Sequence, residues 1–447
     1  MSNAKLSSPT SATRRSFVQT GGAALAAMGA AGVALHAGAV ETLAVTGGPK
    51  TVTVPAARQS ALTRWPRYGA AEKKALHDLI DTNEFYAELP KFEKEWQQYT
   101  KSAYVKAHMN GTSALTSMYF ALDLPAGSEI MVPSYTFFAT CLAMRFFGYV
   151  PIFIDIDPKT ACFDLEDAKR KLTPRTKAMV AMHSWGLPCE MDRISGFAKE
   201  KGLILLEDAA HAHAASMQGR KMGTWGSMGI FSFQASKPMP AVEGGMGMYQ
   251  TREYFGRATA FGHYEAPEKF AADSPVRKYE GTGFGQKYRM HPFAAAVARQ
   301  QLLGLDERTA ALKANIRKLN DRLAALPGLS EPRCRPDQER VYYYANMLIL
   351  DEKKAGFSRG ALLKALQAEG VRATFWDYPQ QHTLKIYSEA KWWHHPPAIP
   401  ESLPGTLEVN RTHIFLPALY GEAQELNDQY VSAFEKIWAH KGELAKL

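Results

Sequence analysis

Residues 203–208 read Leu-Ile-Leu-Leu-Glu-Asp, and Ala-Ala-His follows at 209–211. Four consecutive apolar residues leave no face for solvent, which is typical of a strand buried in a parallel sheet with helices on both sides. Ligands of such sheets bind beyond the carboxyl ends of the strands. Asp208 stands at that end, so this segment indicates both a fold class and a place for a functional site.

The chain around this segment repeats its pattern. Short apolar segments alternate with helical segments of about ten residues. Strands are expected at 104–107, 129–132, 151–154, 177–182 and 203–206, and helices at 112–122, 137–147, 165–172 and 191–201. This order predicts an α/β fold with a mostly parallel sheet covered by helices. The strand ends at 108–113, 133–137, 183–186 and 208–211 are therefore expected to meet at one edge.

The second half of the chain has a different character. Residues 292–326 are Ala-rich and helical, and strand and helix signals mix from about residue 342. We expect residues 1–39 to be a signal segment. Residues 40–290 are expected to form a large α/β domain with an N-terminal arm, and residues 291–447 connecting helices and a smaller α+β domain.

The charge of the chain invites a nucleic-acid interpretation that its distribution does not favour. The 447 residues have a net charge of +9, and three of the basic residues, Lys5, Arg14 and Arg15, lie in the first 39 residues, which contain no acid. The rest of the chain holds 50 basic and 44 acidic residues without a long basic run. That excess of basic residues is too small to favour nucleic-acid binding.

Four cysteines rule out a disulfide-stapled scaffold, and we expect them to be free and mostly buried.

The first 39 residues have the order of an export signal. Adjacent arginines at 14–15 precede an uncharged Gly- and Ala-rich run at 21–35 and a small-residue cleavage candidate at 37–39. The segment resembles a twin-arginine signal, which exports folded proteins to the periplasm or outside. A mitochondrial presequence and a membrane anchor fit less well, because the arginines are not spread along a helix and the apolar run is short. Without export the protein would be cytoplasmic.

Two residues suggest the chemistry of the site. A carboxylate buried at a strand end, such as that of Asp208, requires a cationic partner. The competing interpretations are a helix N-cap and a metal site with His211 and His213, although histidines two residues apart suit one metal poorly. Lys237 lies between the apolar segment 229–233 and a glycine-rich return, where desolvation would make its amine a nucleophile. The alternative is a surface lysine.

A third element is an anion site at the start of a helix. Gly111-Thr112-Ser113 joins an expected strand to an expected helix, where free backbone N–H groups and two hydroxyl groups can bind a phosphate. Alone this signal is weak, because Ser and Thr are common as plain helix caps. The chain contains neither a GxxxxGK[ST] loop nor a GxSxG motif, which disfavours nucleoside-triphosphate binding and a hydrolase.

Seven ordered motifs together resemble one enzyme family. They read NGTSAL at 110–115, PSYTFFAT at 133–140, PIFIDID at 151–157, HSWGLP at 183–188, LEDAAHAHAA at 206–215, FSFQASKPMPAVEGG at 231–245 and GQKYRMHPFAAAVARQQL at 285–302. The chain is similar, from Leu43 to its C-terminus, to the DegT/DnrJ/StrS-type aminotransferases. These are pyridoxal phosphate (PLP) enzymes of the aspartate-aminotransferase fold, fold type I.

The resemblance implies a role for each cofactor-binding residue. Lys237 looks like the Schiff-base lysine and proton shuttle, and Asp208 like the partner of the pyridinium nitrogen. His211 would lie beside the ring hydroxyl, and Phe137 would stack on the ring. The phosphate donors would be Gly111, Thr112, Ser113 and Ser232.

The resemblance also implies a homodimer with shared active sites. A neighbouring-subunit asparagine usually completes the phosphate site in the family, and Lys287 stands at that position here. A lysine is a good point-charge ligand for phosphate, so binding remains expected with a changed pocket geometry.

The family resemblance implies a ping-pong reaction from glutamate or glutamine to a keto-sugar or cyclitol-type ketone. Gln234, in FSFQ where the family more often has SFH, favours cyclitol-type acceptors. His183 and His382 are further candidates for substrate binding, and no metal is expected. Two alternatives share the fold: a PLP-dependent sugar dehydratase, which Lys237 disfavours because those relatives replace the lysine with histidine, and an exported PLP-binding or sensing protein without turnover.

Overall fold

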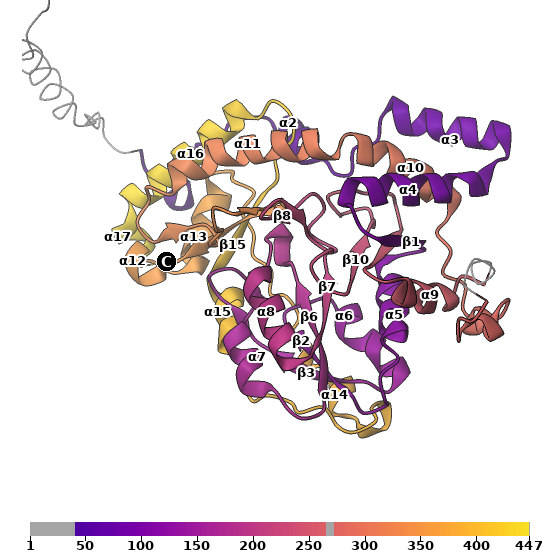
Figure 1. Ribbon diagram of the computed structural model, residues 1–447. Helices are drawn as coiled ribbons and strands as arrows, with labels where there is room; N and C mark the ends of the chain where they lie inside the picture. The colour runs from indigo at the N-terminus through magenta and orange to yellow at the C-terminus, as the bar shows by residue number, and fades with distance from the viewer. Residues whose placement is uncertain (1–40, 265–271, 447) are drawn as a thin grey trace, which may run out of the picture. The chain divides into compact units, whose positions relative to one another are not determined.

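The computed structural model describes residues 41–264 and 272–446 (Figure 1). The chain divides into two units, residues 1–42 and residues 43–447, and the fold described here is that of the second unit. The expected signal at 1–39 lies outside the described residues. No helix in the described ranges is both long enough and apolar enough to cross a membrane.

A seven-stranded sheet forms the centre of the fold. Its spatial order is β1 (Tyr104–His108), β11 (Gly245–Tyr249), β10 (Met228–Ser232), β7 (Ile204–Asp208), β6 (Thr176–Met182), β2 (Glu129–Pro133) and β3 (Val150–Ile154). Only β11 runs antiparallel to its neighbours. The other six strands therefore end at the same edge, and the predicted mostly parallel α/β sheet is confirmed.

Helices cover both faces of this sheet. They include α4 (Glu88–Thr100), α5 (Gly111–Leu122), α6 (Phe138–Leu142), α7 (Leu165–Lys171), α8 (Met191–Lys201) and α9 (Arg252–Ala260). Neighbouring residues of one strand point to opposite faces, since Met179 packs in the same core as α4 and α8 while Val180 packs with α5. Apolar residues are thus buried on both sides, which explains why the strands read as continuous apolar runs.

Two expected helices are divided in the structure. The segment 292–326 forms α10 (Pro292–Leu303) and α11 (Leu305–Leu323), separated by Gly304, which takes a non-helical conformation. Residues 137–147 form α6 followed by a 3-10 turn at Ala143–Phe147.

Three of the four free cysteines are buried and Cys334 is exposed.

A second core lies in the C-terminal part of the chain. The antiparallel strands β12 (Leu329–Ser330), β14 (Ala345–Leu350) and β15 (His413–Pro417) pack with α11, α13 (Arg359–Ala368) and α16 (Gln424–Ala439). The N-terminal arm, residues 43–54, also packs there, since Leu43, Val52 and Val54 belong to this second core. The N-terminal arm therefore packs against elements from the C-terminal end of the chain, such as α16.

The segment 331–344 crosses from the second core to the edge of the central sheet. Its backbone amides at Arg333 and Val341 donate to the carbonyls of Lys159 and Gly186, at 2.7 and 3.0 Å. Gly186 has a φ of +82°, and a side chain there would meet the carbonyl oxygen of Val341 at 2.5 Å. The close approach of the two backbones therefore requires glycine.

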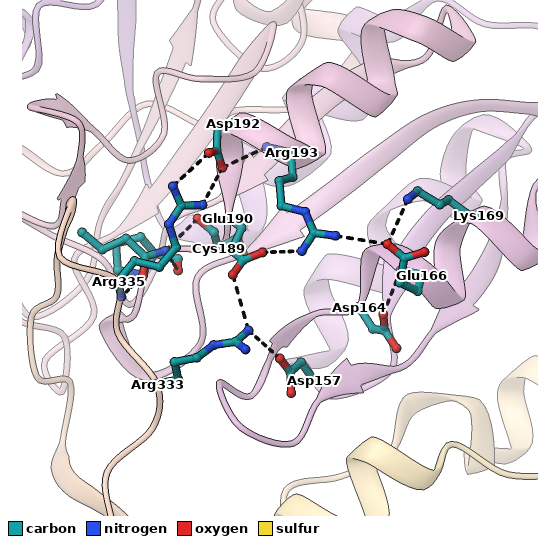
Figure 2. Close-up of polar contacts among 12 residues, drawn as sticks. Asp157, Asp164, Glu166, Lys169, Cys189, Glu190, Asp192, Arg193, Arg333 and Arg335 are labelled. Carbon is teal, nitrogen blue, oxygen red and sulfur yellow. Dashed lines mark hydrogen bonds and ion pairs between the residues drawn. The ribbon is translucent and has the colours of Figure 1, made fainter.

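Ion pairs hold the start of this segment to β4 (Ile156–Asp157) and to α8 (Figure 2). Arg333 contacts Asp157 at 3.0 Å, and Arg335 contacts Asp192 at 2.9 Å. The chain beyond these contacts leads directly to Tyr343, which lines the cavity described next.

Candidate active site

A cavity of about 780 Å³ opens at the carboxyl edge of the central sheet. That volume is typical of sites for small molecules. Its lining comes from the ends of five strands (β1, β2, β6, β7 and β10), from the return into β11, from the 331–344 segment and from a C-terminal loop at 376–384. The structure thus brings together the strand ends whose meeting the sequence predicts.

Lys237 lines this cavity and its amine faces a tyrosine. Nζ lies 3.4 Å from the hydroxyl of Tyr343 and 4.5 Å from the centre of its ring. The same hydroxyl is 3.1 Å from Oγ of Ser236. The backbone carbonyl of Lys237 accepts a hydrogen bond from the indole of Trp65 at 3.1 Å. Lys237 is therefore anchored through its backbone, and its amine is presented to the cavity.

Asp208 lines the same cavity at the end of β7 and is only 4% exposed. Its Oδ2 accepts a hydrogen bond from Thr140 at 2.7 Å, and its Oδ1 accepts one from the amide of Ala210 at 3.1 Å. The second contact is a local turn bond of the kind expected of a cap. Both partners are neutral, so the negative charge of this buried carboxylate remains to be balanced by a cation in the cavity.

His211 is a neutral ring in the cavity wall. Its ring stacks on that of Tyr343 at 4.0 Å, and its buried Nδ1 has no hydrogen-bond partner among the described residues. Burial, with a smaller effect of Lys237, holds the pKa of His211 well below its usual value. His211 lines the cavity, so an unpartnered nitrogen of its ring is a candidate partner for a polar group of a ligand.

The metal interpretation finds no support in the described residues. No group of three metal-ligating side chains gathers in them. His213 does not line the cavity and packs against Phe231 and Trp96, with ring centres 4.9 and 6.2 Å away. Burial lowers the pKa of His213 to about 3.

The start of α5 forms one end of the cavity. Gly111 begins the helix, and a side chain there would meet Cβ of Ser232 at 2.8 Å. Gly111, Thr112 and Ser232 all line the cavity. Ser113 lies one residue further and closes a capping box instead, with its amide 2.8 Å from Oδ1 of Asn110 and its hydroxyl 2.8 Å from the carbonyl of the same residue. The first turn of α5 therefore offers backbone N–H groups and a threonine to an anion, and Ser232 adds a hydroxyl from the end of β10.

Two predicted cofactor residues lie at exposed positions. Phe137 lines the cavity and is 50% exposed, with its ring 4.2 Å from that of Phe138. Lys287 is exposed and does not line the cavity of its own chain. That Lys287 binds the cofactor phosphate of a neighbouring subunit stays a prediction.

The three candidates for substrate binding occupy different environments. Gln234 lines the cavity, and its Oε1 accepts hydrogen bonds from the amide and the hydroxyl of Ser236 at 2.8 and 2.6 Å. His183 is fully buried away from the cavity, with Nε2 3.0 Å from Glu207. His382 contacts Oγ of Ser134 at 2.7 Å and borders the cavity only through its neighbour in the chain.

Several lining residues have no counterpart in the sequence-based site. They are Trp185, Glu243, Tyr343, Trp376 and Tyr378. Trp185 lies in the HSWGLP motif, but Tyr343, Trp376 and Tyr378 come from the C-terminal part of the chain, where no motif singles them out. The only available signal is the density of aromatic residues at 342–344 and 375–378.

The residues of the cavity fit PLP. A lysine amine, a buried carboxylate with neutral partners, an unpartnered imidazole nitrogen and a helix N-terminus share one cavity. These groups match, in turn, an aldehyde, a pyridinium nitrogen, a ring hydroxyl and a phosphate.

Comparisons with known proteins agree with this arrangement. Residues 66–434 match the model of the DegT/DnrJ/EryC1/StrS aminotransferase family. The chain is 32% identical over 361 residues to 3-amino-5-hydroxybenzoate synthase of Amycolatopsis mediterranei (strain S699), covering 74% of this chain and 91% of that protein. It is 29% identical over 343 residues to L-glutamine:scyllo-inosose aminotransferase of Streptomyces griseus, covering 73% and 79%. An X-ray structure of an aminotransferase from Psychrobacter cryohalolentis is similar with a TM-score of 0.76 and 27% identity, covering 85% of this chain and 100% of that chain.

Proposed function

The chain belongs to the DegT/DnrJ/EryC1/StrS aminotransferase family and is a PLP-dependent aminotransferase, and we propose that it moves an amino group from glutamine or glutamate to a keto-sugar or cyclitol-type ketone. In the overall exchange, the donor's α-carbon gives up its amino group and one hydrogen and gains the oxygen of a keto acid. The acceptor's carbonyl carbon gains the amino group and a hydrogen and loses its oxygen. The names of the synthase and the inosose aminotransferase support an acceptor of this type.

One juxtaposition is the main support for this function. The amine of Lys237 and the carboxylate of Asp208 line the same cavity as the N-terminus of α5. When bound, PLP supplies an electron sink that allows a proton to leave the donor's α-carbon. Lys237 would take that proton and return it, because its amine lies at the end of a flexible side chain that lines the cavity. Asp208 would balance the positive charge of the pyridinium nitrogen, and Gly111, Thr112 and Ser232 would bind the phosphate.

The same residues separate the proposal from its two alternatives. A dehydratase of this fold replaces the lysine with histidine, so Lys237 favours amino transfer. A binding or sensing protein without turnover would need only the cofactor-binding groups, and a donor would leave its cofactor unchanged.

We further propose a homodimer and export through the twin-arginine route. Lys287 is exposed outside its own cavity, where it is free to approach the cofactor of a second subunit. The arginine pair and the uncharged run within residues 1–39 support export to the periplasm. Folding around a cytoplasmic cofactor before export gives this route a physical reason. Light scattering of the purified protein, and fractionation of cells with an Arg14→Lys, Arg15→Lys control, test the two proposals separately.

The central experiment follows the visible absorption of the cofactor. The purified protein should show a band that Lys237→Ala abolishes or shifts. Glutamine or glutamate should bleach it, and a keto-sugar or cyclitol-type ketone should restore it. A band that no amino donor changes would favour the binding protein, and a spectrum unchanged in Lys237→Ala would contradict the assignment of the lysine.

A further inference from the structure

Three buried side chains are linked in a row at the end of β1, which we call the histidine row: Tyr249, His108 and His263. Nε2 of His108 lies 3.2 Å from the hydroxyl oxygen of Tyr249, and Nδ1 of His108 lies 3.1 Å from Nε2 of His263. Tyr249 and His108 are fully buried, and His263 is 5% exposed. None of the three lines the cofactor cavity, so the proposed function gives them no role.

Both imidazole rings of the histidine row are neutral. Burial lowers the pKa of His108 to about 3, and burial also holds the pKa of His263 well below its usual value. A neutral imidazole offers one N–H donor and one acceptor nitrogen, so each contact of the row can be a hydrogen bond. A buried nitrogen that loses its partner costs free energy, so the structure resists separation of the two rings.

The segment that presents Lys287 is attached through its backbone to the neighbour of His263 and to the end of β1. The carbonyl of Gly262 accepts a hydrogen bond from the amide of Tyr288 at 2.7 Å, and the carbonyl of Tyr288 accepts one from the amide of Met109 at 2.7 Å. Gly262 has a φ of +90°, and a side chain there would meet the ring of Tyr288 at 2.7 Å. Lys287 directly precedes Tyr288 and is exposed, so these contacts fix its backbone while its side chain lies at the surface.

The histidine row therefore connects two elements that the proposed function assigns to phosphate binding. His108 ends β1 three residues before Gly111, which begins α5 and the phosphate site of the same subunit. His263 is joined to the segment of Lys287, which is assigned to the phosphate of the other subunit. An ammonium on a flexible four-carbon stem binds well only if its backbone is held, because ordering the stem costs conformational entropy.

We propose that His263 is a positioning residue, which through His108 fixes the segment that presents Lys287 and thereby sets the affinity of the partner subunit for the phosphate of PLP. This inference rests on the proposed homodimer with shared active sites. Its effect crosses the interface between subunits, so that replacement of His263 in one subunit changes the cofactor affinity of the other. A merely structural role of His263 would weaken the site of the subunit that carries the replacement.

Heterodimers of differently tagged subunits separate these two outcomes. Lys237→Ala in one subunit removes or shifts the cofactor band of that subunit, so titration of the apo-heterodimer with PLP reports on the other. In the first arrangement, His263→Phe lies in the subunit that keeps Lys237. Its site then faces an unchanged Lys287 of the partner subunit, and the Kd for PLP should equal that of wild type.

In the second arrangement, His263→Phe and Lys237→Ala share one subunit, and the intact site of the other subunit faces the altered segment. We expect the Kd for PLP to rise about fivefold there, as for the loss of one hydrogen bond. Lys287→Ala in the same place should raise the Kd about tenfold, and adding His263→Phe should raise it no further, because both changes act on one contact.

Three more variants distinguish position from a general effect on folding. His263→Gln should restore most of the affinity, since its amide keeps a hydrogen-bonding group. Gly262→Ala should raise the Kd in the second arrangement only, because its methyl group would displace Tyr288 by an independent route. His413→Phe is the matched control, since His413 is 2% exposed but lies in β15, and it should change the Kd in neither arrangement.

The two arrangements give a clear decision. A Kd that rises only in the second arrangement supports the inference. A Kd that rises only in the first, equally in both, or in neither would overturn it. If Lys287→Ala leaves the Kd unchanged, or if the protein is a monomer, the proposed shared active site fails instead.

Discussion

Replacement of Tyr343 by phenylalanine isolates a single hydroxyl group beside the reactive amine. Phenylalanine keeps the ring that stacks on His211 at 4.0 Å and lies 4.5 Å from Nζ of Lys237. The change removes only the hydroxyl group, which is 3.4 Å from Nζ of Lys237 and 3.1 Å from Oγ of Ser236. We expect this hydroxyl to orient the amine when it moves a proton.

The distances set the size of the effect. An ordinary hydrogen bond contributes about 0.5–1.5 kcal/mol, and we take about 1 kcal/mol for the contact between Tyr343 and Lys237. A loss of about 1 kcal/mol corresponds to a roughly fivefold slower proton transfer. The affinity for PLP should change little, because the residues proposed to bind it are intact.

The assay is a single-turnover measurement of bleaching by glutamine, with a titration of the cofactor band as the second readout. Tyr344→Phe is the matched control, since Tyr344 is adjacent in the chain, 52% exposed and outside the cavity lining. The reasoning fails if Tyr343→Phe bleaches at the wild-type rate, or if Tyr344→Phe slows the reaction equally.

Three further changes test the attachment of the N-terminal arm, the start of α5 and the surface ion pairs of Arg335. Glu369→Gln should lower the free energy of unfolding by about 3 kcal/mol, measured by chemical denaturation, because it leaves the buried ammonium of Lys436, 3.1 Å away, without its carboxylate. Burial alone would raise the pKa of Glu369, but hydrogen bonds from the N-terminal arm and from Lys436 hold it below its usual value of 4.5. Its contribution is therefore complete above that pH and is lost as the pH falls through the lowered pKa, a loss that Glu369→Gln should not show. Gly111→Ala should weaken PLP binding at least tenfold in a cofactor titration, because the new methyl group would meet Ser232 at 2.8 Å. Arg335→Ala should change the stability by about 1 kcal/mol or less, since its partly exposed ion pairs (Figure 2) are screened by solvent, and a larger change in the melting temperature would contradict this.

The sequence predicted the central sheet well because buried parallel strands have a strong local pattern. Asp208 was singled out by its position at a strand end, whereas the role of Lys237 came from the family resemblance, and both residues line one cavity. The division of residues 292–326 at Gly304 was missed, since a single glycine is tolerated in many helices. Tertiary packing, and not the helix propensity of the segment, decides where such a helix is interrupted.

Residues whose role depends on distant packing could not be placed. Ser113 has the residue type of a phosphate donor, but its hydroxyl is used by the capping box. His183 follows a strand as expected, yet Glu207 in the neighbouring strand binds its ring in the interior. Tyr343 and Trp376 reach the cavity only because a segment more than 100 residues from Lys237 folds back over the sheet edge. The spacing of residues along the sequence gives no indication of this long-range contact.

The attachment of the N-terminal arm has a consequence for the order of synthesis. The amide of Ala44 donates to Glu369 at 2.8 Å, and the carbonyl of Pro49 accepts from Lys436 at 2.8 Å. A ribosome makes both partners more than 300 residues after the arm. The residues that follow the expected signal therefore cannot form their final contacts until almost the whole polypeptide has left the ribosome. Docking of the arm can therefore be completed only after the C-terminal elements have been made, which suits the export of a folded protein that we propose.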